Sequence, residues 1–125
     1  MDAGARPDIL IVHSRIDPAE LRRLVDQYFG DMVKLVVDVR RRVVAIGGEL
    51  HADAEVLLLE DGSAQADLWG ANYYPGLGPS RSLEFTALIN IRPAQGNRSM
   101  EIQDAAVRDA VRGIVHGLVG TGDPL

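Results

Sequence analysis

The sequence predicts one α+β domain, a mainly antiparallel sheet with about three helices in the order β-α-β-β-α-β-β-β-α. Segments typical of strands occur in neighbouring pairs, as hairpins require, and segments with helical periodicity separate these pairs. A chain of 125 residues, 46% hydrophobic and 25% charged, can also bury one core. We expect the domain to span residues 8–119, with helices on one face of the sheet. Residues 1–7 and 120–125 are expected to be flexible tails.

The first half of the domain predicts a strand, a helix and a hairpin. The strand covers residues 8–13, the helix residues 17–29, and the hairpin strands residues 33–39 and 43–46. Asp17 is suited to the N-cap, Pro18 to the first helical position and Glu20 to the third. β-Branched residues dominate both hairpin strands, which favours extended backbone.

Residues 49–60 fit two interpretations. Strict alternation over 49–56 fits a strand, whereas the Ala, Glu, Asp and Leu content favours a helix that Asp61-Gly62 would end. We predict a helix. The helix has two apolar sides. The first consists of Leu50, Ala54, Leu57 and Leu58, and the second, nearly opposite, consists of Ala52, Val56 and Leu59. A helix that is apolar on two sides usually contacts two neighbours, here the sheet and either another helix or a second subunit.

The second half predicts three strands and a last helix. The strands cover residues 68–74, 83–92 and 99–102, with a loop at 75–82 and a turn at 93–97. Phe85, Ala87, Ile89 and Ile91 alternate along the second of these strands, so that it has one buried side. Asp104 is suited to cap the helix, whose apolar stripe runs from Val107 to Leu118.

Composition excludes several classes of protein. The net charge is −5, which argues against a nucleic-acid partner. No apolar run approaches the roughly 20 residues of a membrane span, so we expect no membrane partner. The chain has no cysteine, which excludes disulfides and thiolate metal sites, and its first residues lack the signal-peptide pattern. We therefore expect a cytoplasmic protein.

The densest polar cluster is Glu49, His51, Asp53 and Glu55. On a strand these four side chains would share one face and could hold a divalent metal. On the predicted helix only the pairs Glu49/Asp53 and His51/Glu55 align, and the second pair could tune an acid–base histidine. No fixed metal motif is matched, so no cofactor is assigned, and His51, Glu49 and Glu55 are the catalytic candidates. A solvated helix face with a local ion pair explains the cluster equally.

A second polar cluster surrounds the turn at 93–97, and its ligand-binding candidates are Asn90, Arg92, Asn97 and Arg98. Two guanidinium groups with amide donors could clamp a small anion. Asn90 and Arg92 are expected on one face of their strand, opposite the apolar face, which an ordinary solvent face would also produce. Trp69 is a candidate for stacking on a planar ligand, with core packing as the alternative.

Several segments together resemble a known family. They are Gly30–Lys34, Ala45–Glu55, Leu58–Ser63, Asp67–Gly70, Asn90–Pro93 and Asn97–Ile102. Over roughly residues 8–119 the chain resembles a family of small prokaryotic proteins catalogued as a domain of unknown function. The resemblance implies a bacterial or archaeal cytoplasmic protein and carries no activity with it.

Two hypotheses of function follow. The first is a small binding or interaction domain that acts as a homo-oligomer, from the helix that is apolar on two sides. The second is a small hydrolase in which His51 and nearby carboxylates work beside an anion clamp of Arg92 and Arg98. The hydrolase requires His51 and the clamp to meet in one pocket.

Overall fold

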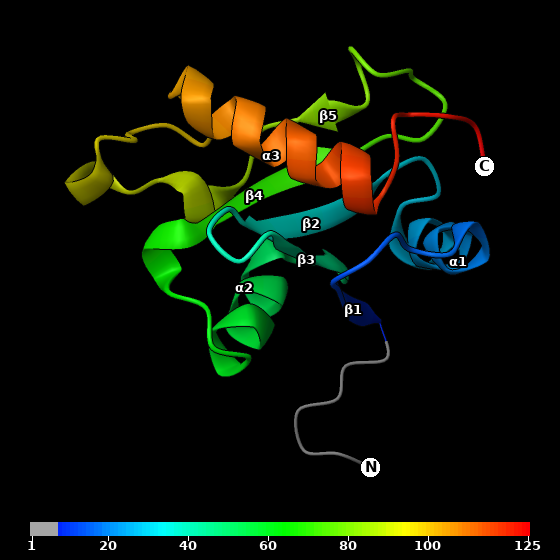
Figure 1. Cartoon of the computed structure of the whole chain (residues 1–125), viewed down its shortest axis with the longest axis horizontal. Helices are drawn as coiled ribbons and strands as arrows, with labels where there is room; N and C mark the ends of the chain where they lie inside the picture. Colours follow the sequence, from blue (N-terminus) through cyan, green and yellow to red (C-terminus); the bar gives the residue numbers. More distant parts are fainter. Residues whose placement is uncertain (1–7) are drawn as a thin grey trace.

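The computed structural model describes residues 8–125, which form three layers (Figure 1). The strands are β1 (Ile9–Val12), β2 (Val33–Asp38), β3 (Val43–Gly47), β4 (Leu68–Tyr73) and β5 (Leu83–Glu84). The helices are α1 (Pro18–Tyr28), α2 (His51–Glu60) and α3 (Ala105–Leu118), with the short 3-10 helices η1 (Gln65–Asp67), η2 (Leu88–Asn90) and η3 (Pro93–Gln95). The predicted α+β class, three helices and antiparallel sheet are confirmed.

The sheet has the strand order β1-β3-β2-β4-β5, and every neighbouring pair is antiparallel. Alternation along the strands gives it two buried faces. Leu35 of β2 belongs to the core under α1 and α3, whereas its neighbour Val36 belongs to the core under α2. The expectation of helices on one face is therefore wrong, because α2 covers the face opposite α3 (Figure 1).

The predicted helix ends are confirmed where a side chain caps them. Asp17 accepts a hydrogen bond from Ala19 N and Asp104 accepts from Ala106 N, which satisfies free N–H groups at both N-termini. Residues 51–60 form the predicted helix, α2, and not the alternative strand. Its N-cap residue, Leu50, has no capping side chain and is exposed rather than packed on the predicted inner side.

The segment 83–102 departs from the predicted pair of strands. β5 has two residues, and the chain then enters η2 and η3. The returning segment makes one isolated bridge, Thr86 to Glu101, in place of a strand over 99–102. Pro93, which has no N–H to give to a ladder, starts η3. Asn90 and Arg92 therefore do not lie on a strand face.

The end of the chain is held more closely than predicted. Gly122 N donates a hydrogen bond to the Tyr73 hydroxyl at 2.8 Å, and Gly122 O accepts from Gly76 N at 2.9 Å. Residues 120–122 therefore pack against the domain. The other predicted tail, residues 1–7, lies outside the described residues. Within residues 8–125, no helix has the length and apolar character needed to cross a membrane.

Candidate functional site

The sheet face under α2 continues beyond the N-terminal end of this helix. A helix of ten residues is about 15 Å long, and α2 packs its buried side on Val36, Ala45 and Leu68. Beyond its N-terminal end the same face carries Lys34 of β2. Cross-strand register places Lys34 opposite Asn72 of β4 and Asn72 opposite Glu84 of β5. These three residues form a polar row across three strands.

An open cavity of about 460 Å³ lies over Lys34 and Asn72 of this row, and we call it the His51 cavity; Glu84 is exposed and does not line it. It is lined by Met32, Lys34, Leu50, His51, Ala52, Asn72, Thr86, Ala87, Leu88, Ile89 and Met100. Its floor is polar and its walls, from α2 and the loop after β5, are apolar. Cavities of this size with few polar groups are typical of small-molecule sites.

His51 is the first residue of α2, and its ring is buried against β4. Its Nε2 lies 2.9 Å from the carbonyl oxygen of Ala71. A carbonyl can only accept, so Nε2 carries the proton, and Nδ1 of the neutral ring is an acceptor. Burial lowers the pKa of His51 below 6.5, and Lys34 lowers it further, against the opposing effects of the Ala71 carbonyl, Asn72 and Glu84. The ring is therefore uncharged at neutral pH.

Gly70 provides the space that the His51 ring occupies. A Cβ atom at residue 70 would stand 2.5 Å from Ala87 Cβ and 3.2 Å from His51 Cδ2. The first of these distances is shorter than van der Waals contact permits. A glycine in the middle of β4 thus lets the ring and the loop approach the sheet closely.

Asn72 is 7% exposed and has a fixed orientation. Its Nδ2 donates to Glu84 Oε1 at 2.7 Å and lies 3.4 Å from Thr86 O, two groups that can only accept. Oδ1 is therefore the other terminal atom, and it accepts no hydrogen bond from residues 8–125. The atom is enclosed by the fold, and a buried acceptor without a donor costs stability.

The match to a known family covers most of the chain. A family model described as "Protein of unknown function (DUF5674)" matches residues 10–118. The chain belongs to this family. The resemblance seen in the sequence is thus confirmed, and the family's description names no activity. No curated protein and no solved structure matches the chain.

In this family member the residues of the predicted anion clamp complete the outer edge of β4 instead of facing a ligand. The carboxamide of Asn90 accepts from Gly70 N at 2.8 Å and donates to Gly70 O at 3.0 Å, as a neighbouring strand would. Further along the same edge, Arg92 donates through Nη2 to Leu68 O and through Nη1 to Gln65 O. Side chains thus satisfy the edge beyond the two residues of β5.

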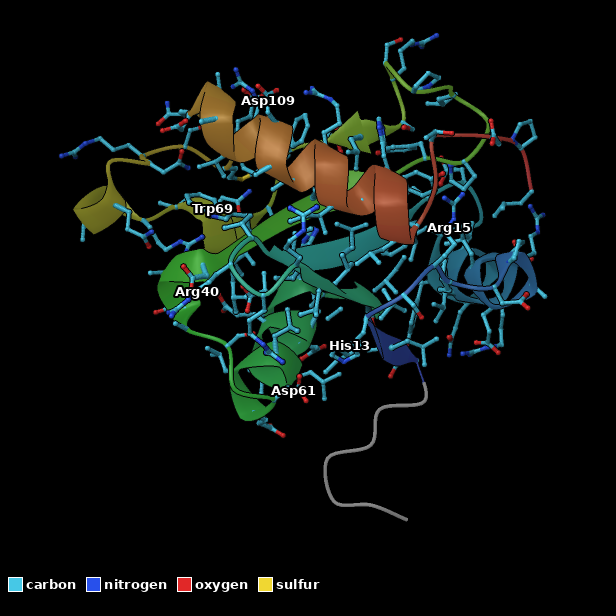
Figure 2. All side chains as sticks on the ribbon, viewed as in Figure 1. His13, Arg15, Arg40, Asp61, Trp69 and Asp109 are labelled. Atoms are coloured by element: carbon cyan, nitrogen blue, oxygen red, sulfur yellow. The ribbon has the colours of Figure 1, made fainter. Side chains whose placement is uncertain are left out.

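The remaining candidates of that cluster also lie outside the His51 cavity. Asn97 donates from Nδ2 to the carbonyls of Asn90, Ser99 and Glu101 and so holds the loop together. Arg98 is exposed. Trp69 is buried beside α3 (Figure 2). The Arg92 guanidinium lies 4.2 Å from its ring centroid. None of Asn90, Arg92, Asn97, Arg98 and Trp69 lines the His51 cavity.

The carboxylates predicted to assist His51 are not bonded to it. Glu49 is exposed and Glu55 is half-buried. Burial lowers the pKa of Arg92, and the charge of Glu55 raises it to a smaller extent. The four-ligand face of Glu49, His51, Asp53 and Glu55 requires a strand and does not form on α2. Across residues 8–125, no three His, Asp or Glu side chains gather as a metal site would require.

The sequence interpretation missed Lys34, Asn72 and Glu84. Lys34 is the only lysine of the chain, and it interrupts an apolar strand. Asn72 likewise interrupts the mainly apolar strand β4. In both strands, a polar residue inside an apolar run was a signal that the sequence offered. Glu84 could be found only from the pairing of β4 with β5, because nothing in its own segment distinguishes it.

Proposed function

We propose that the chain is a small binding domain that takes a small molecule in the His51 cavity and acts as a homo-oligomer. The observation that carries the first part is an open, largely apolar cavity of about 460 Å³ that is lined by a few polar side chains. Lys34 and His51, which line the same cavity, add a cation and a neutral imidazole. This combination of apolar walls and few polar groups favours a ligand site over a bare sheet surface.

Blocking the cavity tests this proposal. Ala52 is exposed and lines the cavity, so Ala52→Trp should fill its mouth without disturbing the core. Glu60 is exposed at the other end of α2 and does not line the cavity, which makes Glu60→Trp the matched control.

Thermal unfolding would be followed with a set of small carboxylates, amides and amines. At saturation, one class should raise the Tm of the wild type and of Glu60→Trp by several degrees. Ala52→Trp should show no shift. The proposal fails if no compound raises the wild-type Tm or if the two variants respond alike.

The outer face of α2 supports the homo-oligomer. Val56 is 48% exposed and Leu59 is 38% exposed, and they lie opposite the buried Ala54 and Leu58. The two-sided apolar pattern therefore leaves one side without a neighbour in a single copy. A second copy of the chain, packing the same face, is the occupant we propose.

Light scattering at micromolar concentration tests the oligomer. The wild type should have a multiple of the 13.5 kDa chain mass. Val56→Asp should give a folded monomer, because it places a charge in the proposed interface. Glu60→Lys, at an exposed neighbour, should keep the wild-type mass. A monomeric wild type would end the proposal.

A small hydrolase is the second candidate, supported by the neutral ring of His51, whose Nε2 is held by Ala71 O. The predicted form of this hydrolase required His51 and the clamp of Arg92 and Arg98 in one pocket, and that condition is not met, because neither arginine lines the cavity. In the form proposed here Lys34 would supply the cation. Hydrolysis of 4-nitrophenyl acetate is the test. His51→Gln should abolish it and His13→Gln, at an exposed residue, should not. Equal rates in both variants would rule the hydrolase out.

A further inference from the structure

We infer that β1, at the open edge of the sheet, pairs antiparallel with β1 of a second copy of the chain. The five-stranded sheets of the two copies then continue into one another. This pairing adds a second contact to the proposed homo-oligomer, on which it rests, and it uses a surface separate from the outer face of α2.

The two edges of the sheet differ in how their backbone groups are satisfied. On the β5 side, the side chains of Asn90 and Arg92 bond to the backbone of β4 where no strand covers it. β1 is the opposite edge, and β3 is its neighbouring strand (Figure 1). Within residues 8–125, no group outside β3 forms a hydrogen bond with Ile9–Val12. The N–H and C=O groups of β1 that point away from β3 therefore have no partner there.

β1 also lacks the features that keep most edge strands from pairing, which are charged residues, prolines and bulges. All four residues are apolar, and the register with β3 is continuous. Leu10 packs toward the core under α1 and α3, Ile11 packs toward the core under α2, and both are only half-buried. A neighbour that covers both side chains must lie in the plane of the sheet, as a strand does.

A second copy of β1 fits this edge because the strand is complementary to itself. Rotation by 180° about an axis perpendicular to the sheet places Leu10 opposite the partner's Leu10, or Ile11 opposite the partner's Ile11. In both registers, apolar side chains from the same face meet across the pair. The ends of the strand are complementary too, since Asp8 precedes β1 and exposed His13 follows it. Antiparallel pairing places Asp8 near the partner's His13 and separates the two Asp8 carboxylates, which a parallel pair would place side by side.

The size of the contact determines when it forms. Stable interfaces bury about 800 Å² on each partner, more than a strand of four residues offers. β1 pairing alone is therefore too weak at micromolar concentration, and Val56→Asp stays a monomer. The two-fold axis of the α2 contact lies parallel to the sheet, nearly at right angles to the axis at β1. Two such contacts close into a tetramer, in which two β1 pairs form together and reinforce one another.

Cysteine cross-linking tests the pairing, because the chain has no cysteine of its own. Opposite residues of an antiparallel pair have Cβ atoms about 4.5–5.5 Å apart, close to the distance that a disulfide spans. Under mild oxidation, Leu10→Cys or Ile11→Cys, whichever lies on the axis, should form disulfide-linked dimers about tenfold faster than Leu77→Cys. Leu77, which is 44% exposed on the loop after β4, is the matched control, since random collisions would favour it.

Light scattering gives an independent measurement. The wild type should have the mass of four chains of 13.5 kDa. Leu10→Lys places a charge on the edge strand, as many natural edge strands do, and should give a folded dimer. Leu77→Lys should keep the mass of the tetramer. Circular dichroism checks that Leu10→Lys is folded, and the cross-linking comparison remains decisive if it is not.

The inference is overturned if Leu10→Cys and Ile11→Cys both cross-link no faster than Leu77→Cys, or if the wild type has the mass of two chains. In either case, a monomeric Val56→Asp would show that the α2 contact stands alone. Cross-linking at the full rate in a Val56→Asp background would show the reverse, that β1 pairs and the outer face of α2 does not. A monomeric wild type without cross-links would end both proposals.

Discussion

Replacing Asn90 by Asp should strongly destabilise the domain. Asn90 is fully buried, and its Nδ2 donates to Gly70 O and to Met100 O, each at 3.0 Å. Asn90→Asp keeps the size of the side chain and the oxygen that accepts from Gly70 N, but it puts a carboxylate oxygen against two carbonyls. Met100 O keeps a donor in Ala87 N, so only Gly70 O loses one, which costs about 1–3 kcal/mol, and the buried unpaired carboxylate adds to this loss. A domain of this size has about 5–15 kcal/mol in all.

Urea unfolding at pH 7, followed by the fluorescence of Trp69, measures this loss, because that residue is the only tryptophan and is buried. Gln65→Glu is the matched control, since it makes the same charge change on the exposed surface of η1. Its effect should stay below about 0.5 kcal/mol. The deficit of Asn90→Asp should also shrink toward pH 4, because protonation of the buried carboxylate restores one donor. Equal stabilities of the two variants, or a deficit that does not change with pH, would refute this reasoning.

Three further predictions concern α2 and the cavity. Leu58→Asp should unfold much of the population, because Leu58 is fully buried and Leu-to-Ala losses alone are about 2–5 kcal/mol. Circular dichroism measures the unfolded fraction. The control, Glu60→Lys, should shift stability by less than about 0.5 kcal/mol. Burial lowers the pKa of His51 and of His116 in the folded state, so the unfolded chain binds protons first as the pH falls. The free energy of unfolding should therefore decrease as the pH falls from 6.5 to the lowered pKa of the folded state. His51→Gln and His116→Gln should each flatten the pH dependence in urea unfolding, and an unchanged profile would contradict this. Gly70→Ala should cost about 1–3 kcal/mol in thermal unfolding, because its Cβ would stand 2.5 Å from Ala87 Cβ, and wild-type melting would contradict that distance.

Capping residues and β-branched runs predicted correctly those elements that depend on interactions between neighbours in the sequence. Asp17 and Asp104 cap the helices as their positions indicate, and the β-branched runs of β2 and β3 pair as a hairpin. The face that each helix covers is not a local property. α2 lies on the opposite face from α3, and only its two-sided apolar pattern indicated a second contact.

The strands predicted after β5 do not form, and the reason is physical. Its alternation of apolar residues fits a strand, but the carboxamide of Asn90 makes the bonds to Gly70 that a strand would make. A side chain that replaces a strand in this way is visible only when its distant partner is known. The same contact explains why Asn90 resembled a ligand group in the sequence, since an amide among apolar residues indicates a hydrogen-bonding role without identifying the partner.

The loop built in this way gives the cavity its outer wall. A polar row such as Lys34, Asn72 and Glu84 on an uncovered sheet face would ordinarily be solvated, and Asn72 would then have no reason to be buried. Instead Leu88 and Met100 line the cavity beside Asn72, and Asn90, which ends η2, bonds to the Met100 carbonyl. The residues predicted to clamp an anion thus have a structural role, because they fix the loop whose apolar side chains cover Asn72. The proposed site is the His51 cavity and not the surroundings of Arg92, because the cavity combines apolar walls with Lys34 and His51, whereas Arg92 is bonded to the edge of β4.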